Sequence, residues 1–367
     1  MKTKHPTVSS NKQASPSAGW TFAELIADPA VGQRWDRVRQ YFFLRESTYD
    51  MTRRCNIRCE GCYYFEGEKQ HTQEEGDPER WRALMQAEKD RGITYVVLAG
   101  AEPSLVPELL AVCHEQMPLG AIATNGIRLI PETVGYKIHI SVWGNDATSQ
   151  KIRGASNMLQ QQIDNYRDDP RAVFVYTFTP QNISQAEPVT RLLADAGCRI
   201  TFNLFSAPVG YTGRLRHSTQ SLQQTRQTML DLLQGYPETV LYSPYNAVAH
   251  THRQGLHDLF GCTYPRRNPS TDQGLGRSFR QYRTDLNLDR NSACCVPDTD
   301  CPDCRHYAAA SAIVTARLFR HAVNPRTFRS WLDFVDTYLA VWVKGYSKGK
   351  NLCDETVPPP GVELTAN

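Results

Sequence analysis

The chain has 367 residues, 40% of them hydrophobic, and a formal net charge of +3. This length exceeds one average domain, but (β/α) barrels often run past about 200 residues as a single domain. The near balance of basic and acidic residues gives no sign of a nucleic-acid partner. No apolar run approaches the ~18–20 residues that span a bilayer. We therefore expect a substantial core and neither a membrane nor a nucleic-acid partner.

Residues 1–19 are polar and lack the apolar stretch of a signal peptide, which predicts a disordered tail. Residues 20–40 form a predicted N-terminal helical segment, with its helix from Phe22 to about Arg39. The chain has eleven cysteines, yet it is neither small nor equipped for export. Disulfides are typical of small secreted chains. The composition therefore favours reduced, metal-binding cysteines in the cytoplasm.

Short strands alternate with helices between residues 41 and 206. The predicted strands are the end of 41–49, then 93–98, 121–124, 137–143, 173–178 and 199–205. The predicted helices are 78–91, 104–116 and 186–196. Such alternation implies parallel pairing with right-handed crossovers. Six strand units are too few for a full eightfold barrel. The predicted fold is α/β, a partial (β/α)6 TIM-like barrel with a C-terminal, cysteine-containing extension.

The pattern changes in the extension, residues 207–350. A helix is predicted over 220–234, then an irregular, basic, Gly- and Pro-containing region over 261–305, and then two amphipathic helices over 307–321 and 326–343. We expect this extension to close the barrel mouth. Residues 351–367 read as a tail, with three prolines at 358–360. The basic region is interrupted by acidic residues, which favours a solvated loop over a binding site.

Cys55, Cys59 and Cys62 form the run Cys-x-x-x-Cys-x-x-Cys directly after the first predicted strand. Three thiols this close can converge on one metal centre, but structural zinc and ordinary iron–sulfur clusters usually take four protein ligands. A three-cysteine cluster leaves one iron open to a small molecule. The run can also be read as a zinc site that a distant cysteine or histidine completes.

A second motif, Gly100-Ala-Glu-Pro103, ends the second predicted strand. With both motifs in this order, residues 41–206 resemble the radical S-adenosylmethionine (radical SAM) superfamily. The resemblance implies that Cys55, Cys59 and Cys62 hold a [4Fe-4S] cluster whose open iron binds S-adenosylmethionine (SAM). Reductive cleavage of SAM to a 5′-deoxyadenosyl radical would follow, and the radical would abstract hydrogen from a peptide or small-molecule substrate. An electron donor such as flavodoxin or ferredoxin is the implied partner.

The same resemblance implies further contacts to SAM near the strand ends. Glu102, preceded by Gly100 and Ala101, would accept a hydrogen bond from the methionyl ammonium, and Arg153 would pair with the carboxylate. The remaining implied contacts are Ser141, Thr124, Asn125 and Tyr63. Many members carry an aromatic residue before the third cysteine, where this chain has Gly61, so Tyr63 and Tyr64 are expected to cover the adenine instead. Some of these residues also have a purely structural alternative. Glu102 could be an acid that favours the helix dipole, Asn125-Gly126 a simple turn, and Arg153 part of a surface ion pair.

A second cysteine group lies downstream in the extension. Cys301-Pro-Asp-Cys304 has close ligand spacing, and the other members are Cys262 and Cys295, with Cys294 as the alternative ligand. This group is similar to the auxiliary clusters of the SPASM and twitch subgroups, although its spacing does not match their patterns. The alternatives are an auxiliary iron–sulfur cluster, zinc and no metal. Cys113 and Cys198 are expected in the core, and Cys353 is expected to be unligated.

Two functions of other classes compete with the enzyme. One is a zinc-stabilised binding module, and the other is an electron-transfer iron–sulfur protein that does not cleave SAM. Nothing in residues 207–367 identifies a substrate, a net reaction or an oligomeric state.

Overall fold

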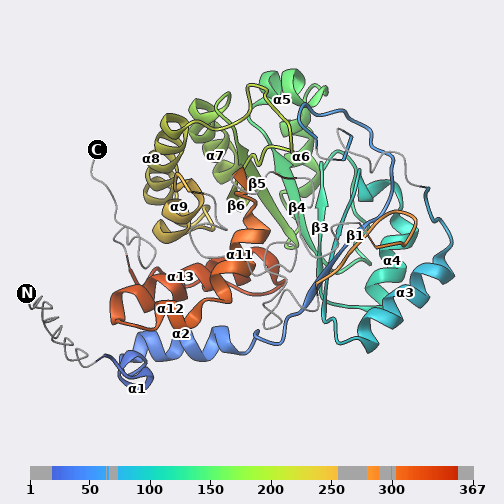
Figure 1. Ribbon diagram of the computed structural model, residues 1–367. Helices are drawn as coiled ribbons and strands as arrows, with labels where there is room; N and C mark the ends of the chain where they lie inside the picture. Colours follow the sequence, from blue (N-terminus) through green and yellow to red (C-terminus); the bar gives the residue numbers. More distant parts are fainter. Residues whose placement is uncertain are drawn as a thin grey trace, which may run out of the picture.

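The computed structural model describes residues 19–62, 64–65, 73–254, 279–288, 299 and 303–353 (Figure 1). The predicted tails over 1–19 and 351–367 lie almost wholly outside these residues, as does most of the irregular region over 261–305. None of the described helices is long and apolar enough to cross a membrane.

A single parallel sheet organises the molecule. Its strands are β1 (Glu46–Asp50), β2 (Tyr95–Ala99), β3 (Gly120–Thr124), β4 (Lys137–Val142), β5 (Ala172–Phe178), β6 (Ile200–Leu204) and β7 (Gln281–Tyr282). The strand order is β6-β5-β4-β3-β2-β1-β7, so six strands follow one another in chain order and β7 pairs with the outer side of β1. The sheet curves without closing (Figure 1). The predicted partial barrel is confirmed.

Helices cover the convex face of the sheet and fill its concave side (Figure 1). They are α1 (Phe22–Leu25), α2 (Pro29–Arg39), α3 (Pro78–Asp90), η2 (Pro103–Leu105), α4 (Pro107–Gln116), α5 (Asp146–Arg153), α6 (Met158–Tyr166), η3 (Ile183–Gln185), α7 (Ala186–Asp195), α8 (Thr219–Gly235), α9 (Pro244–Thr251), α11 (Tyr307–Thr315), α12 (Leu318–His321) and α13 (Pro325–Trp342). The outward strand residues and the helices α3, α4 and α6–α8 form the main hydrophobic core.

Successive residues of a strand point to opposite faces of the sheet. On β4, Ile138 and Ile140 therefore enter the main core, while His139 and Ser141 line an internal cavity. The other strands divide their side chains in the same way, with Val175 and Thr177 of β5 facing that cavity. The two-residue period thus separates a packed outer face from a partly polar inner one.

Helices α11 and α13 pack against inward residues near the start of the strands. Tyr95, the first residue of β2, clusters with Ala121, Val173 and Trp342, and its hydroxyl donates to the backbone oxygen of Trp342. These helices therefore fill the amino-terminal end of the barrel. The start of α11 also lines the internal cavity, and closure of the barrel mouth by the extension stays a prediction.

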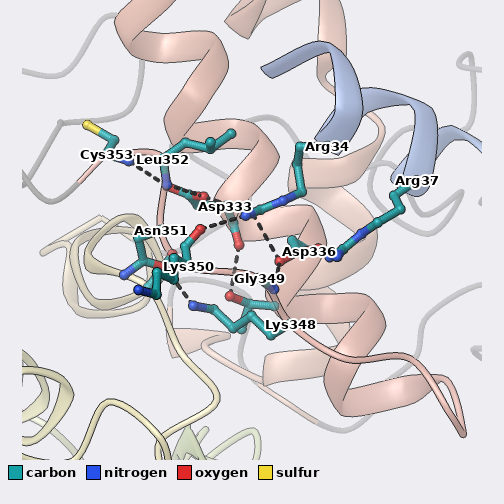
Figure 2. Close-up of polar contacts among 12 residues, drawn as sticks. Arg34, Arg37, Asp333, Asp336, Lys348, Gly349, Lys350, Asn351, Leu352 and Cys353 are labelled. Atoms are coloured by element: carbon teal, nitrogen blue, oxygen red, sulfur yellow. Dashed lines mark hydrogen bonds and ion pairs between the residues drawn. The ribbon is translucent and has the colours of Figure 1, made fainter. Parts of the chain in front are cut away.

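A buried ion cluster joins the two ends of the described chain (Figure 2). Arg34 and Arg37 reach from α2 toward Asp333 and Asp336 of α13, with N–O distances of 3.1 and 3.0 Å from Arg34 to the two carboxylates. Backbone N–H groups of residues 346–353 donate to the same carboxylates. Each buried charge therefore has an opposite charge and further hydrogen bonds, which is what buried ions require.

Several predicted elements differ at their ends or are divided. The predicted helix over residues 22–39 is two helices, because Asp28 caps a new one whose first residue is Pro29. The helix predicted over 104–116 starts with a short 3-10 turn and resumes at Pro107. The helix predicted over 307–321 is divided into α11 and α12. Elements α5, α6, α9 and β7 were not predicted.

Candidate active site

A cavity of about 280 Å³ opens where the strands of the sheet end. Its walls include the cysteine run, the turns after β2 and β3, the inner face of β4–β6 and the start of α11. Most of the predicted site residues line it: Cys55, Cys59, Cys62, Gly100, Ala101, Glu102, Thr124, Asn125, Ser141 and Arg153. Tyr63 lies outside the described residues. The carboxyl ends of parallel strands meet at one edge, which is why these separate segments converge.

The three cysteines of the run are partly shielded from water. Burial raises the pKa of the Cys62 thiol to about 11 and also raises the pKa of Cys55. Asn125 approaches Cys55, with 3.8 Å between its Nδ2 and the sulfur. Because a thiolate is the form that binds metal, a cation must accompany these sulfurs when they ionise.

Within the described ranges, no three Cys, His, Asp or Glu side chains converge closely enough to hold one metal ion. A structural zinc ion draws its ligands onto a single point. An iron–sulfur cube is larger than one ion, so its thiolates need not meet at a point. A cluster and the zinc site that the spacing left open both stay predictions for these thiols.

Glu102 is 1% exposed and fixes the edge of the sheet. Its Oε1 accepts hydrogen bonds from the Thr124 hydroxyl (2.6 Å) and the Ser104 N–H (3.0 Å), and its Oε2 accepts from the Asn125 N–H (2.8 Å). Three of the roughly four lone-pair sites of the carboxylate are thus used within the chain. One lone-pair site of the carboxylate is left to accept a hydrogen bond from a ligand ammonium. The contact of Glu102 with SAM stays a prediction.

The turn before Glu102 needs glycine at one position only. Gly100 has a φ of +78°, and a Cβ there would lie 2.5 Å from Cα of Asp50. Both the left-handed backbone and this close approach exclude a side chain. Ala101 is not among the residues with positive φ. The alanine at the second position of the motif is therefore accommodated without backbone strain.

Arg153 is 4% exposed, and its partners among the described residues include no carboxylate. Its Nη1 donates to the backbone oxygen of Ser141, and its Nε is buried without a hydrogen-bond partner. The guanidinium lies over the Trp143 ring, 6.0 Å from the ring centre. A buried cation that lacks its counter-charge is costly unless a ligand supplies one. The surface ion pair considered for Arg153 is thus not what the structure has.

Gly61 and Phe205 pack against each other beside the cysteines. Gly61 has a φ of +69°, and a Cβ there would lie 2.7 Å from Cζ of Phe205. Phe205 follows β6, lines the cavity and contacts Trp143 edge-on at 5.8 Å between ring centres. Tyr64 is buried and does not line the cavity. The aromatic wall next to the third cysteine therefore comes from Phe65 and Phe205, and the expectation that Tyr64 serves there is not supported.

Of the second cysteine group, only Cys304 belongs to the described residues, where it is half-buried. The other members, Cys262, Cys294, Cys295 and Cys301, lie outside them. Cys113 and Cys198 are buried, as expected for core residues. An auxiliary cluster stays a prediction.

The sequence reading missed several cavity residues, among them His139, Trp143, Asn203, His306 and Tyr307. A signal existed for two of them. In the predicted strand 137–143, the two-residue period puts His139 and Trp143 on the same face as Ser141. His306 and Tyr307 had no such signal, because they reach the cavity from the extension.

Comparisons with known proteins agree on the family. Residues 49–208 match the model of the radical SAM superfamily. The Fe-coproporphyrin III synthase of Methanosarcina barkeri is 28% identical over 222 residues, 53% of this chain and 54% of that protein. The pre-heme d1 synthase of Dinoroseobacter shibae is 26% identical over 199 residues, 50% of this chain and 49% of that protein. The chain spans about half the length of these curated relatives.

Among solved structures, Streptococcus suis SuiB is 14% identical with a TM-score of 0.48, covering 72% of this chain and 64% of its own. The enzyme anSMEcpe with bound AdoMet and a peptide is 11% identical with a TM-score of 0.47, covering 81% of this chain and 96% of its own. At these scores the likeness is loose and carries no functional weight. The family assignment comes from the sequence match together with the open parallel sheet. The chain thus contains a radical SAM domain over residues 49–208.

Proposed function

We propose that this protein is a radical SAM enzyme in which Cys55, Cys59 and Cys62 ligate a [4Fe-4S] cluster. Such a cluster, when reduced with SAM at its open iron, supplies a 5′-deoxyadenosyl radical that abstracts hydrogen from a substrate. The substrate is a peptide or small molecule, and the electron comes from a donor such as flavodoxin or ferredoxin. A second cluster at Cys304 and its neighbours remains a separate prediction.

The observation that carries the proposal is the shared wall of the cavity. The three thiols line the same space as the buried guanidinium of Arg153, which has no carboxylate partner among the described residues. Thiolates suit an iron–sulfur cluster, while a guanidinium suits a carboxylate, which it can hold by two parallel hydrogen bonds. SAM carries one carboxylate, so a single ligand satisfies both features.

The other cavity residues position these groups and exclude water. Glu102 holds Thr124 and the Asn125 backbone, and Gln162 donates to the carbonyls of Asn125 and Ser141 at 2.6 and 2.9 Å. The ends of β2, β3 and β4 are thereby tied to one another. Trp143 and Phe205 add aromatic surface to the wall. A firmly held cavity with aromatic walls suits a reaction that water or stray donors would divert.

The test is anaerobic purification followed by iron and sulfide counting and an assay for 5′-deoxyadenosine after dithionite reduction. Wild type is expected to hold iron and sulfide and to form 5′-deoxyadenosine. The triple variant Cys55→Ala, Cys59→Ala, Cys62→Ala is expected to lose that activity, while Cys113→Ala, which alters a buried core thiol, should keep it. Activity that survives in the triple variant would falsify the proposal.

The same measurements separate the two rival functions. A zinc-stabilised binding module would be colourless, with zinc in place of iron. An electron-transfer protein would hold iron and sulfide yet form no 5′-deoxyadenosine. About four irons per chain left in the triple variant would support the auxiliary cluster.

A further inference from the structure

We infer that the part of the cavity lined by His306 and Tyr307, here called the α11 wall, binds an uncharged group of the substrate that both donates and accepts hydrogen bonds, such as an amide or a hydroxyl. The inference rests on the proposed function, because it takes the cavity as the place where substrate lies beside SAM. Beyond the proposed function, the inference assigns a substrate-binding role to residues of the C-terminal extension, far in sequence from the cysteine run. It also names the chemical class of the group that binds there.

The hydrogen-bond direction at Tyr307 can be worked out from its neighbours. His139 lies between two oxygens, with Nε2 2.9 Å from the backbone oxygen of Val341 and Nδ1 2.7 Å from the Tyr307 hydroxyl. A carbonyl can only accept, so Nε2 carries the proton and Nδ1 does not. The Tyr307 hydroxyl must then donate to Nδ1, and its oxygen is left able to accept.

The α11 wall is held firmly in place. The Tyr307 N–H donates to Oδ1 of Asn203 at 3.1 Å, and the Tyr307 ring stacks on Trp342 with centres 5.1 Å apart. The Asn203 amide in turn donates to the Thr177 hydroxyl at 3.3 Å. Strands β4, β5 and β6 thus all support this short segment. A site held by rigid elements is suited to binding, because little order is lost when a ligand arrives.

His306 has a buried ring nitrogen without a hydrogen-bond partner among the described residues. Its ring lines the cavity beside Tyr307, with ring centres 5.1 Å apart. No hydrogen bond to the ring is made by any described residue, and its Nδ1 is buried. By contrast, His321 bonds both to the Tyr245 hydroxyl (2.6 Å) and to the Arg317 backbone oxygen (2.8 Å). A buried ring nitrogen without a partner costs stability, which a bound ligand would restore.

These groups together select the ligand. A neutral imidazole offers one N–H donor and one acceptor, and Tyr307 adds an acceptor. An amide or hydroxyl can donate to the Tyr307 oxygen while accepting from His306. A carboxylate has no proton to donate, and no lysine or arginine other than Arg153 is found among the described lining residues to pair with it. Burying an unpaired charge costs more than burying an amide.

The first experiment uses the full-length chain labelled with ¹³C-histidine, and titrates acetamide, acetate and methylammonium as probes. The ring signal of His306 is assigned by its loss in His306→Leu. Acetamide is expected to shift this signal in a saturable way. Acetate is expected to act at Arg153 and leave the His306 signal unmoved, and methylammonium should not shift it either. The inference is wrong if acetamide gives no saturable shift, or if either charged probe does.

The second experiment compares His306→Leu with His321→Leu by thermal unfolding. The His306 ring forms no hydrogen bond with a described residue, and leucine keeps the backbone oxygen that accepts from the Ala310 N–H. The leucine should therefore leave the midpoint unchanged or raise it. His321→Leu should lower the midpoint by several degrees, because Tyr245 loses its partner. A drop in His306→Leu as large as that in His321→Leu, or a failure to fold, would mean that His306 is structural and would overturn the inference.

The outcomes separate this inference from the proposed function. Formation of 5′-deoxyadenosine does not involve the α11 wall. If wild type forms it but acetamide does not bind at His306, the inference fails while the proposed function stands. If acetamide binds but no 5′-deoxyadenosine forms, the site stands and the proposed function fails.

Discussion

Arg34 and Arg153 are both buried, at 8% and 4% exposure, but their surroundings differ. Arg34 lies between Asp333 and Asp336 and donates to the Lys350 backbone oxygen as well (Figure 2). Arg153 contacts one carbonyl and the face of Trp143. The first arginine joins α2, α13 and residues 346–353, whereas the second borders a cavity.

The difference separates polar groups whose partners lie within the fold from polar groups that, under the proposed function, pair with a ligand. A buried charge whose partners are all within the chain stabilises only as long as every partner stays. A buried group without partners weakens the fold and is tolerated where binding needs it. The following predictions test this division, from the largest expected effect on stability to the smallest.

Asp336→Ala is expected to destabilise the protein by about 3–5 kcal/mol, because it leaves the buried Arg34 short of a counter-charge. The Asp336 side chain is fully buried and also accepts from Arg37 at 2.6 Å. Urea unfolding measures the change. The control is Asp36→Ala, which removes an exposed partner of Arg39 on the same helix and should cost less than about 1 kcal/mol. Equal losses in the two variants would contradict the role given to the ion cluster.

Gly61→Ala is expected to cost about 2–4 kcal/mol, the sum of a left-handed backbone and a clash with Phe205. Gly210→Ala separates the two terms, because Gly210 has a similar φ of +81° but nothing within 4 Å of its Cβ position. The Gly61 variant should also bind less iron per chain, since the clash displaces the loop between Cys59 and Cys62. If both glycine variants lose a similar amount of stability, the Phe205 side chain moves aside at little cost, and the predicted clash is wrong.

Stability is expected to fall as the pH drops below about 6.5, because burial lowers the pKa of His139 to about 3. The unfolded chain takes up a proton near pH 6.5 and the folded chain does not, so acid favours unfolding over the window between the two values. His139 alone should contribute a loss of about 2 kcal/mol at pH 5. Urea unfolding across pH 5–8 should show a shallower slope for His139→Gln. An unchanged slope would mean that His139 does not stay neutral in the fold.

Arg153→Met is expected to change stability by less than about 1 kcal/mol, yet to weaken SAM binding about 10- to 100-fold through loss of a charge-assisted pair. Equilibrium dialysis with the reconstituted protein measures the affinity. Arg171→Met is the control, because Arg171 is equally buried but pairs with Asp169 at 2.6 Å and donates to backbone carbonyls. It should lose stability and keep its affinity for SAM. If Arg153→Met instead lost stability and kept its affinity for SAM, Arg153 would support the fold and would not bind the ligand.

Much of the barrel could be predicted from the sequence, because strand periodicity is a local property. The predicted strands over 137–143 and 173–178 agree with β4 and β5 to within a residue. Helices α5 and α6 were missed, since polar residues dominate Asp146–Arg153 and a left-handed Asn157 precedes Met158. The two-residue strand β7 is too short to show any period.

The candidate site likewise has features that local sequence patterns predict and features that depend on contacts between distant segments. The cysteine spacing and the turn from Gly100 to Glu102 are local, and the carboxyl ends of parallel strands had to bring them near Ser141. Contacts between distant segments could not be read in this way. Phe205 packs on Gly61, Tyr307 bonds His139, and Arg34 pairs with Asp333.

The amino-acid sequence by itself therefore determined the family, the order of the strands and the spacing of the three cysteines. Each of these follows from patterns among residues a few positions apart. Only the tertiary structure decided which buried polar groups have partners. Arg34 and Arg153 are the same residue type, and the carboxylates that satisfy the first come from a helix 299 residues along the chain. Whether a buried charge is a support or a binding site depends on long-range packing, which no local pattern records.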